Sequence, residues 1–175
     1  MSSSKKLALM LFALVLICGF SVAPVQAADD TWISTKIKIA LMTTDGAGRN
    51  AVKVESDHGK VTLHGTVDSQ TVKDKAEATA RSVGGVTDVR NLLQVVKESR
   101  QESVKAVDKD VKEAVERALK ANKDFDGIKV KSVDNGLVFL EGSTPSLALK
   151  LGAIETAYSV AGVMQVASGI ETKDK

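Results

Sequence analysis

The sequence predicts an α+β fold built twice in tandem, and two observations carry that prediction. Residues 61–65 (VTLHG) return 77 positions later as residues 138–142 (VFLEG). Around both segments, stretches with helical periodicity and stretches of alternating polarity follow one another in the order α-β-β-α-β. We therefore expect each copy to form a three-stranded mixed sheet with two helices on one face.

Residues 1–27 have the pattern of a secretory signal peptide. Lys5 and Lys6 precede an apolar run over residues 7–20, and Val25 and Ala27 supply small residues at the usual positions just before the expected cleavage point. The run is too short to favour a membrane-spanning helix. We expect cleavage after Ala27 and export of the remainder.

Removing this segment changes the charge balance. The whole chain has 24 basic and 22 acidic residues, and the loss of Lys5 and Lys6 leaves 22 of each. A mature chain without net charge gives no support to nucleic-acid binding. The only cysteine, Cys18, lies inside the apolar run behind Ile17, where bacterial lipoproteins need a small residue. Lipidation at Cys18 is therefore the less favoured alternative.

The two copies span residues 30–96 and 107–173, and a mostly polar linker over residues 97–106 could extend the helix that follows it. Each copy opens with apolar residues at helical spacing. In the second copy, Asp108 and Asp110 are candidate helix caps, with Glu113 completing a capping box. The matched positions are Ile33, Ile37 and Leu41 in the first copy and Val111, Val115 and Leu119 in the second.

Two alternating runs follow in each copy, joined by turns at residues 57–59 (DHG) and 134–136 (DNG) that are typical of hairpins. A second amphipathic helix and a last strand complete the unit. The alternation places Val61, Leu63 and Val67 on the face that meets the helices. It places Thr62, His64 and Thr66 on the opposite face, which we expect to meet water.

The V-x-L-x-G strand and the sequence VGGV at residues 83–86 resemble the BON domain, named for osmotically inducible and nodulation proteins. The second copy keeps the pattern at residues 138–142 and 160–163 (VAGV). The resemblance implies a role in the bacterial envelope: association with phospholipid, often anionic, and support of membrane integrity under stress. It also implies a periplasmic location. Lipoprotein members of the family carry a lipidated cysteine that this chain lacks at the required place.

We identify no catalytic residues, metal site or cofactor in the sequence. His58 lies in a turn and His64 on the outward face of a strand, so the two histidines do not converge. Residues 122–127 (NKDFDG) match the first half of a calcium loop, but its twelfth position, which should be glutamate, is Val133. We expect a non-enzymatic protein.

Each copy has apolar residues beyond those needed for its core. The second copy has a helical stripe of four such residues where the first copy has Gln70, Asp74, Glu77 and Arg81. The first copy has Trp32 and Ile39 on the far side of its first helix. Packing between the domains, membrane insertion and binding of client proteins are alternative roles for these residues. The stripe of the second copy consists of Leu147, Leu151, Ile154 and Tyr158.

A basic face is the candidate lipid contact. Lys109, Lys112, Lys120 and Lys123 share one sector of a helix and its exit. Anionic lipid attracts each such residue by about 1 kcal/mol. We expect weak peripheral binding by these lysines, with Phe125 or Trp32 inserting at the headgroups. Because Glu113 and Glu116 dilute the sector, a merely solvated face is the alternative.

The sequence thus favours a periplasmic protein of osmotic or envelope stress that contacts anionic phospholipid weakly. The alternative function is a chaperone-like or adaptor module, which would bind exported proteins through the stripe of the second copy.

Overall fold

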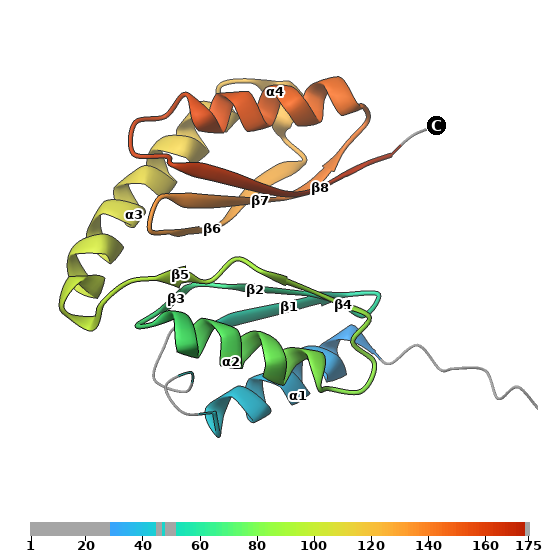
Figure 1. Cartoon of the computed structure of the whole chain (residues 1–175). Coiled ribbons are helices and arrows are strands. Elements are labelled where there is room, and N and C mark those ends of the chain that lie inside the picture. The colour runs from blue at the N-terminus through green and yellow to red at the C-terminus, as the bar shows by residue number, and fades with distance from the viewer. Residues whose placement is uncertain (1–28, 45–46, 48–51, 174–175) are drawn as a thin grey trace, which may run out of the picture.

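The computed structural model describes residues 29–44, 47 and 52–173. The expected signal peptide, with Cys18, lies outside these residues. Residues 30–95 form domain 1 and residues 98–172 form domain 2 (Figure 1). Within the described residues, no helix combines the length and apolar character needed to cross a bilayer.

Domain 1 has the predicted α-β-β-α-β order with a short extension of its sheet. Its three-stranded sheet has the order β1-β2-β4, in which β1 and β2 are antiparallel and β2 and β4 are parallel. A parallel pair, β3 with β5, continues it. The elements are α1 (Asp30–Met42), β1 (Lys53–Asp57), β2 (Lys60–His64), β3 (Thr66–Val67), α2 (Gln70–Arg81), β4 (Asp88–Asn91) and β5 (Gln94–Val95).

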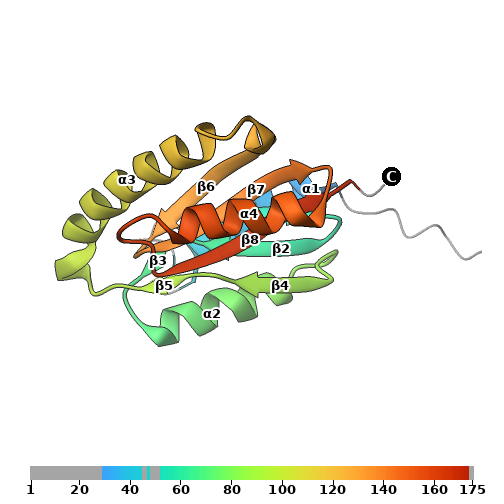
Figure 2. The ribbon, with the colours of Figure 1, turned by 90° about the horizontal axis from the view of Figure 1, so that it is seen from above.

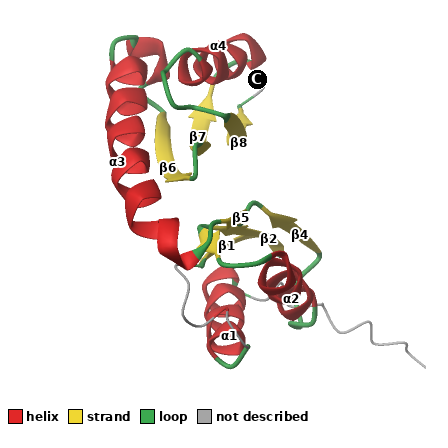
Figure 3. Cartoon of the chain, turned by 60° about the vertical axis from the view of Figure 1, so that its left-hand side comes forward, coloured by secondary structure: helices red, strands yellow, loops and turns green. Residues whose placement is uncertain are grey.

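Domain 2 repeats this topology with longer strands, in the order β6-β7-β8. The expected mixed sheet with two helices on one face is therefore confirmed in both copies (Figure 3). The elements are α3 (Glu98–Lys120), the 3₁₀ helix η3 (Lys123–Phe125), β6 (Ile128–Asp134), β7 (Leu137–Thr144), α4 (Leu147–Tyr158) and β8 (Gln165–Thr172).

Local chemistry explains the strand connections and the second helix of each copy. His58 and Gly59, and likewise Asn135 and Gly136, all have positive φ angles, as a two-residue type I′ hairpin requires. Serine caps the second helix in both copies. The Ser69 side chain accepts a hydrogen bond from the Val72 N–H, and the Ser146 side chain accepts one from the Leu149 N–H. Each helix pair then packs on the predicted inward face of its sheet.

The expected helix cap at Asp108 or Asp110 is wrong, whereas the expected extension of the helix into the linker is confirmed. Helix α3 begins at Glu98, so it includes most of the linker, and Asp108 lies in its interior rather than at a cap. The Asp108 carboxylate instead accepts hydrogen bonds from the backbone N–H groups of Asn135, at 2.7 Å, and Gly136, at 3.0 Å. Asp30 makes the same bonds to the turn of domain 1.

Domain 2 covers part of the outward face of the domain 1 sheet, which corrects the expectation that His64 and Thr66 meet water, whereas Thr62 is half-buried. His64 and Thr66 are only 1% and 7% exposed. The reason is that the two sheets face one another, with the helices on the outside (Figures 1 and 2). The His64 and Phe139 rings lie 5.7 Å apart across this interface, and Arg90 donates a hydrogen bond to the Ser168 carbonyl.

Ion pairs cross the interface as well. The Lys131 ammonium of β6 lies 2.7 Å from the Glu55 carboxylate of β1 and 3.1 Å from the Glu141 carboxylate of β7. Burial opposes ionisation of Glu55, but the hydrogen bond and charge of Lys131 outweigh it and lower the Glu55 pKa. Apolar contacts complete the interface, where Leu92 packs on a cluster from domain 2. That cluster consists of Leu137, Phe139 and Ala167.

Candidate functional site

Three of the four predicted lysines, Lys109, Lys112 and Lys120, share one side of α3, as the helical spacing requires, and Lys123 lies in η3 directly after the helix. Lys109, Lys120 and Lys123 are exposed, and the Lys112 side chain is 42% exposed. Glu116 dilutes the charge, since its carboxylate lies 3.9 Å from the Lys112 ammonium. Because α3 begins at Glu98, exposed Lys105 extends the same sector by one turn. We call Lys105, Lys109, Lys112, Lys120 and Lys123 the lysine face.

Phe125 does not protrude from this surface. It is 6% exposed and belongs to the core of domain 2. With Leu119, Ile128 and Val130 it forms the apolar lining of a hollow of about 390 Å³, beside which lie Lys120 and Lys129. The expectation that Phe125 inserts into a bilayer is therefore wrong. Its ring lines the hollow, so a lipid group would have to enter the hollow to contact it.

Trp32 is not brought together with the lysine face. It is 55% exposed on α1, and the Lys36 ammonium lies 4.9 Å from the centre of its ring. Helix α1 belongs to the helical layer of domain 1, on the opposite side of the paired sheets from α4 (Figure 1). Trp32 and the lysines of α3 therefore belong to the helical layers of different domains.

The apolar stripe of α4 does not pack between the domains. The domains contact each other through their sheets, while α4 lies on the outer side of domain 2 (Figures 1 and 2). Leu147, Leu151 and Tyr158 are 59%, 51% and 49% exposed. Ile154 differs, because it is partly buried against the core of domain 2. Three of the four predicted stripe residues thus form an exposed apolar surface.

Three lysines beside the predicted ones were not expected from the sequence: Lys105 of α3 itself, and Lys53 and Lys131 of the two sheets. Lys53 of β1 and Lys131 of β6 line a cleft of about 290 Å³ together with Lys105, Lys109 and Lys112. Lys105 could have been found, since it precedes Lys109 by four residues on a helix extended into the linker. Lys53 and Lys131 carried no such signal, because their position depends on how the domains dock.

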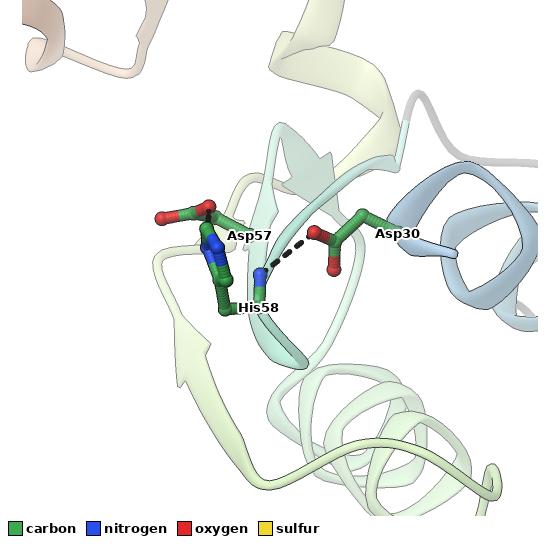
Figure 4. A group of neighbouring side chains, drawn as sticks. All are labelled: Asp30, Asp57 and His58. Carbon is green, nitrogen blue, oxygen red and sulfur yellow. Dashed lines mark hydrogen bonds and ion pairs between the residues drawn. The ribbon is translucent and has the colours of Figure 1, made fainter. Parts of the chain in front are cut away.

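In the described part of the chain, the group of side chains best placed to hold a metal ion is Asp30, Asp57 and His58 (Figure 4). Hydrogen bonds of these three side chains account for their arrangement without a bound ion. The Asp30 carboxylate accepts hydrogen bonds from the Gly59 N–H, the Ser56 hydroxyl and the His58 N–H, which lower its pKa. Asp57 bonds to the His58 ring at 2.6 Å and raises the His58 pKa. These contacts tie α1 to the hairpin.

Comparisons with known proteins agree with the duplicated architecture. The BON domain model matches residues 29–97 and again residues 107–174. Osmotically-inducible protein Y of Escherichia coli (strain K12) is 34% identical over 151 residues, which cover 83% of this chain and 73% of that protein.

Two solved structures of CdsD, a structural protein of the type III secretion system of Chlamydia trachomatis, were also found. They have TM-scores of 0.32 and 0.33 and are 14% identical to this chain. The matches cover 81% and 79% of this chain, and 65% and 60% of the CdsD chains. Two matches to the family model over almost all described residues, and a relative of this identity, show the family: the chain belongs to the BON domain proteins and carries the domain twice.

Proposed function

We propose that this chain is a non-enzymatic periplasmic protein of osmotic or envelope stress that binds anionic phospholipid weakly through the lysine face. The lysine face carries the proposal, because it has four ammonium groups along α3 and a fifth, from Lys123, on η3 directly after it. The osmotically inducible relative supports the link to osmotic stress. The expected signal peptide supports export.

The binding mechanism is electrostatic attraction, with the hollow at Phe125 as a neighbouring apolar contact. Each lysine contributes about 1 kcal/mol near an anionic surface. Glu116 subtracts from that attraction, and a mature chain without net charge adds no long-range field. The affinity should therefore be low, and salt should weaken it because the lysines are exposed.

Vesicle flotation of residues 28–175 tests this proposal. Flotation with phosphatidylglycerol vesicles but not with phosphatidylcholine vesicles, lost at high salt, is the expected result. The double substitution Lys112→Glu and Lys120→Glu exchanges two attractions for two repulsions. It should cost about 4 kcal/mol, or about a thousandfold in affinity.

The matched control reverses the same number of charges elsewhere. Lys38 on α1 and Lys173 after β8 are both exposed and lie outside the lysine face. Lys38→Glu with Lys173→Glu should leave most of the flotation intact. Equal loss in both double variants would mean that only total charge matters, and the lysine face would have no specific role.

A second candidate function rests on the exposed stripe of α4, which three apolar side chains form on the outside of domain 2. An adaptor or chaperone-like protein would use this surface for unfolded exported proteins. Leu147→Asp with Leu151→Asp should abolish suppression of aggregation and leave flotation unchanged. Ile154 is left out of this variant because it packs on the core.

A further inference from the structure

His64 of β2 is a buried titratable side chain at the interface between the two facing sheets (Figure 1). It is 1% exposed, and its ring packs against the Phe139 ring of domain 2. Neither ring nitrogen has a hydrogen-bond partner within the described part of the chain. A buried polar group without a partner is destabilising, so the position of this histidine needs a physical explanation.

Each nitrogen of the His64 ring faces a carboxylate, and the two carboxylates belong to different domains. The Nε2 atom lies 3.7 Å from Glu55 Oε1 of β1, in domain 1. The Nδ1 atom lies 3.7 Å from Asp134 Oδ2 of β6, in domain 2. These separations are longer than hydrogen bonds. Asp134 Oδ2 is itself buried and has no hydrogen-bond partner among the described residues, so a small movement would satisfy both groups.

Only the protonated ring can satisfy both carboxylates. A neutral imidazole has one N–H donor and one nitrogen with a lone pair, so one of the two carboxylates would face that lone pair. The imidazolium has an N–H group on each nitrogen and can donate to Glu55 and Asp134 at the same time. The docked arrangement of the two domains therefore matches the charged form of His64.

The charged groups connected to this site have one net negative charge. The Lys131 ammonium lies between the carboxylates of Glu55 and Glu141. Lys53, the cross-strand neighbour of the histidine on β1, acts through its charge on Asp134. Three carboxylates and two ammonium groups thus form the cluster, and an imidazolium would make it neutral. Burial opposes a charge on the ring, but this negative excess favours one.

Charged groups further from the ring do not reverse this balance. On α3, Lys105 and Lys112 lie 3.8 Å and 3.9 Å from the carboxylates of Glu102 and Glu116, and Asp108 offsets its neighbour Lys109. A cleft of about 510 Å³ between the sheets has three further carboxylates and two further cations in its lining. These residues are Asp57, Asp88, Glu171, Lys60 and Arg90.

The two carboxylates beside the ring stay ionised under conditions that protonate a histidine. Burial opposes ionisation of Asp134, but hydrogen bonds from His64 and Ser132 and the charge of Lys53 lower its pKa. The Glu55 pKa is lowered as well. Histidine ordinarily changes its charge between about pH 5 and pH 8, above the range of these carboxyl groups. Mildly acidic pH therefore permits an imidazolium between two carboxylates.

We propose that protonation of His64 holds the two domains together, so that docking is tighter at mildly acidic pH and looser at alkaline pH. When the domains separate, the ring keeps Glu55 but loses Asp134. Docking therefore takes up a proton, and it weakens as the pH rises through the titration of the imidazole. Separation would also uncover the apolar cluster of Leu137, Phe139 and Ala167, so pH controls access to that surface. This inference does not depend on lipid binding.

X-ray scattering and backbone amide spectra of residues 28–175, at constant ionic strength between about pH 5.5 and pH 8, test the proposal. The ratio of undocked to docked chains should rise about tenfold over this range, the worth of one charge-assisted hydrogen bond to Asp134. The radius of gyration should rise with it, and the amide signals of Leu92 and Phe139 should shift with the same midpoint. His64→Gln should remove this pH dependence, and so should Asp134→Asn.

His58→Gln is the matched control, because His58 is the other of the two histidines and its side chain is 89% exposed. Glu171 of domain 2 has only the smallest of the effects on the His58 pKa, so this variant should keep most of the pH dependence. A radius and signals that do not change with pH, or looser docking at acidic pH, would overturn the proposal. The parent's pH dependence in His64→Gln or in Asp134→Asn, or its loss in His58→Gln, would do the same. If His64→Gln does not fold, Asp134→Asn alone decides.

Discussion

Replacing Asp108 with alanine should destabilise domain 2 strongly, although Asp108 is a charged residue in the interior of a helix. Its side chain is 7% exposed and accepts the N–H groups of Asn135 and Gly136, at 2.7 and 3.0 Å. Asn135 and Gly136 are the two turn residues between β6 and β7, so a neighbouring strand does not pair with these N–H groups. Alanine would leave both without an acceptor.

The expected loss follows from two hydrogen bonds to a charged acceptor. At about 1.5 kcal/mol each, Asp108→Ala should lower the free energy of unfolding of domain 2 by about 3 kcal/mol. For a domain of this size, the melting temperature should fall by about 15 °C. Urea unfolding measures the loss, because the chain has one tyrosine, Tyr158 in α4, and one tryptophan, Trp32 in α1. Their fluorescence reports the two domains separately.

Asp110→Ala is the control, since Asp110 is exposed on the same helix two residues further along. The transition of Tyr158 should move in the Asp108 variant and stay in place in the control. A loss below about 1 kcal/mol, or the same loss in both variants, would refute the idea that the carboxylate holds the hairpin turn on α3. The position of the lysine face relative to the sheet would then need another cause.

Two further predictions concern the domain interface and the turn of domain 1. Lys131→Met should raise the radius of gyration measured by X-ray scattering at neutral pH, because Glu55 and Glu141 would lose the cation between them. The control variant Lys129→Met removes an exposed lysine of the same strand and should leave the radius unchanged. Equal radii for the two variants would show that apolar contacts alone hold the domains together. The Asp30 pKa lies below its ordinary value of 3.8, so its stabilisation is present above that pH and is lost as the pH falls through the lowered value. Asp30→Asn should therefore lose this acid dependence in Trp32 fluorescence, and an unchanged acid transition would contradict the assignment.

The repeat predicted element order and topology because each copy has its own periodicity, turn chemistry and core positions. It left the start of α3 between two alternatives, because Asp108 and Asp110, followed by Glu113, have the pattern of a helix cap, while the linker could extend the helix. The spacing of Val104, Val111 and Val115 already indicated that the helix extends into the linker, and all three are buried. A capping pattern is a local signal, and the bond from Asp108 to a turn 27 residues away is not visible in it.

The environment of His64 could not be predicted from its own copy. Alternation assigned it correctly to the outward face, but whether that face meets water depends on the other domain. A comparison of the copies contains the missing signal, because the outward residues Lys60, Thr62 and Arg90 correspond to Leu137, Phe139 and Ala167. The candidate site depended on this docking, so Lys53 and Lys131 escaped sequence analysis.

A single additional residue distinguishes the edge strand of the second copy and accounts for much of what is specific to this molecule. Val54 matches Val130 at a spacing of 76, whereas Asp57 matches Asp134 at 77. The extra residue forms the bulge in β6, while β1 pairs with β2 in unbroken register. Because Val130 and Val133 both remain against the core, Lys131 and Ser132 both face domain 1. The Lys131 ammonium then pairs with the Glu55 carboxylate, so one insertion in a duplicated unit supplies an ion pair between the two domains.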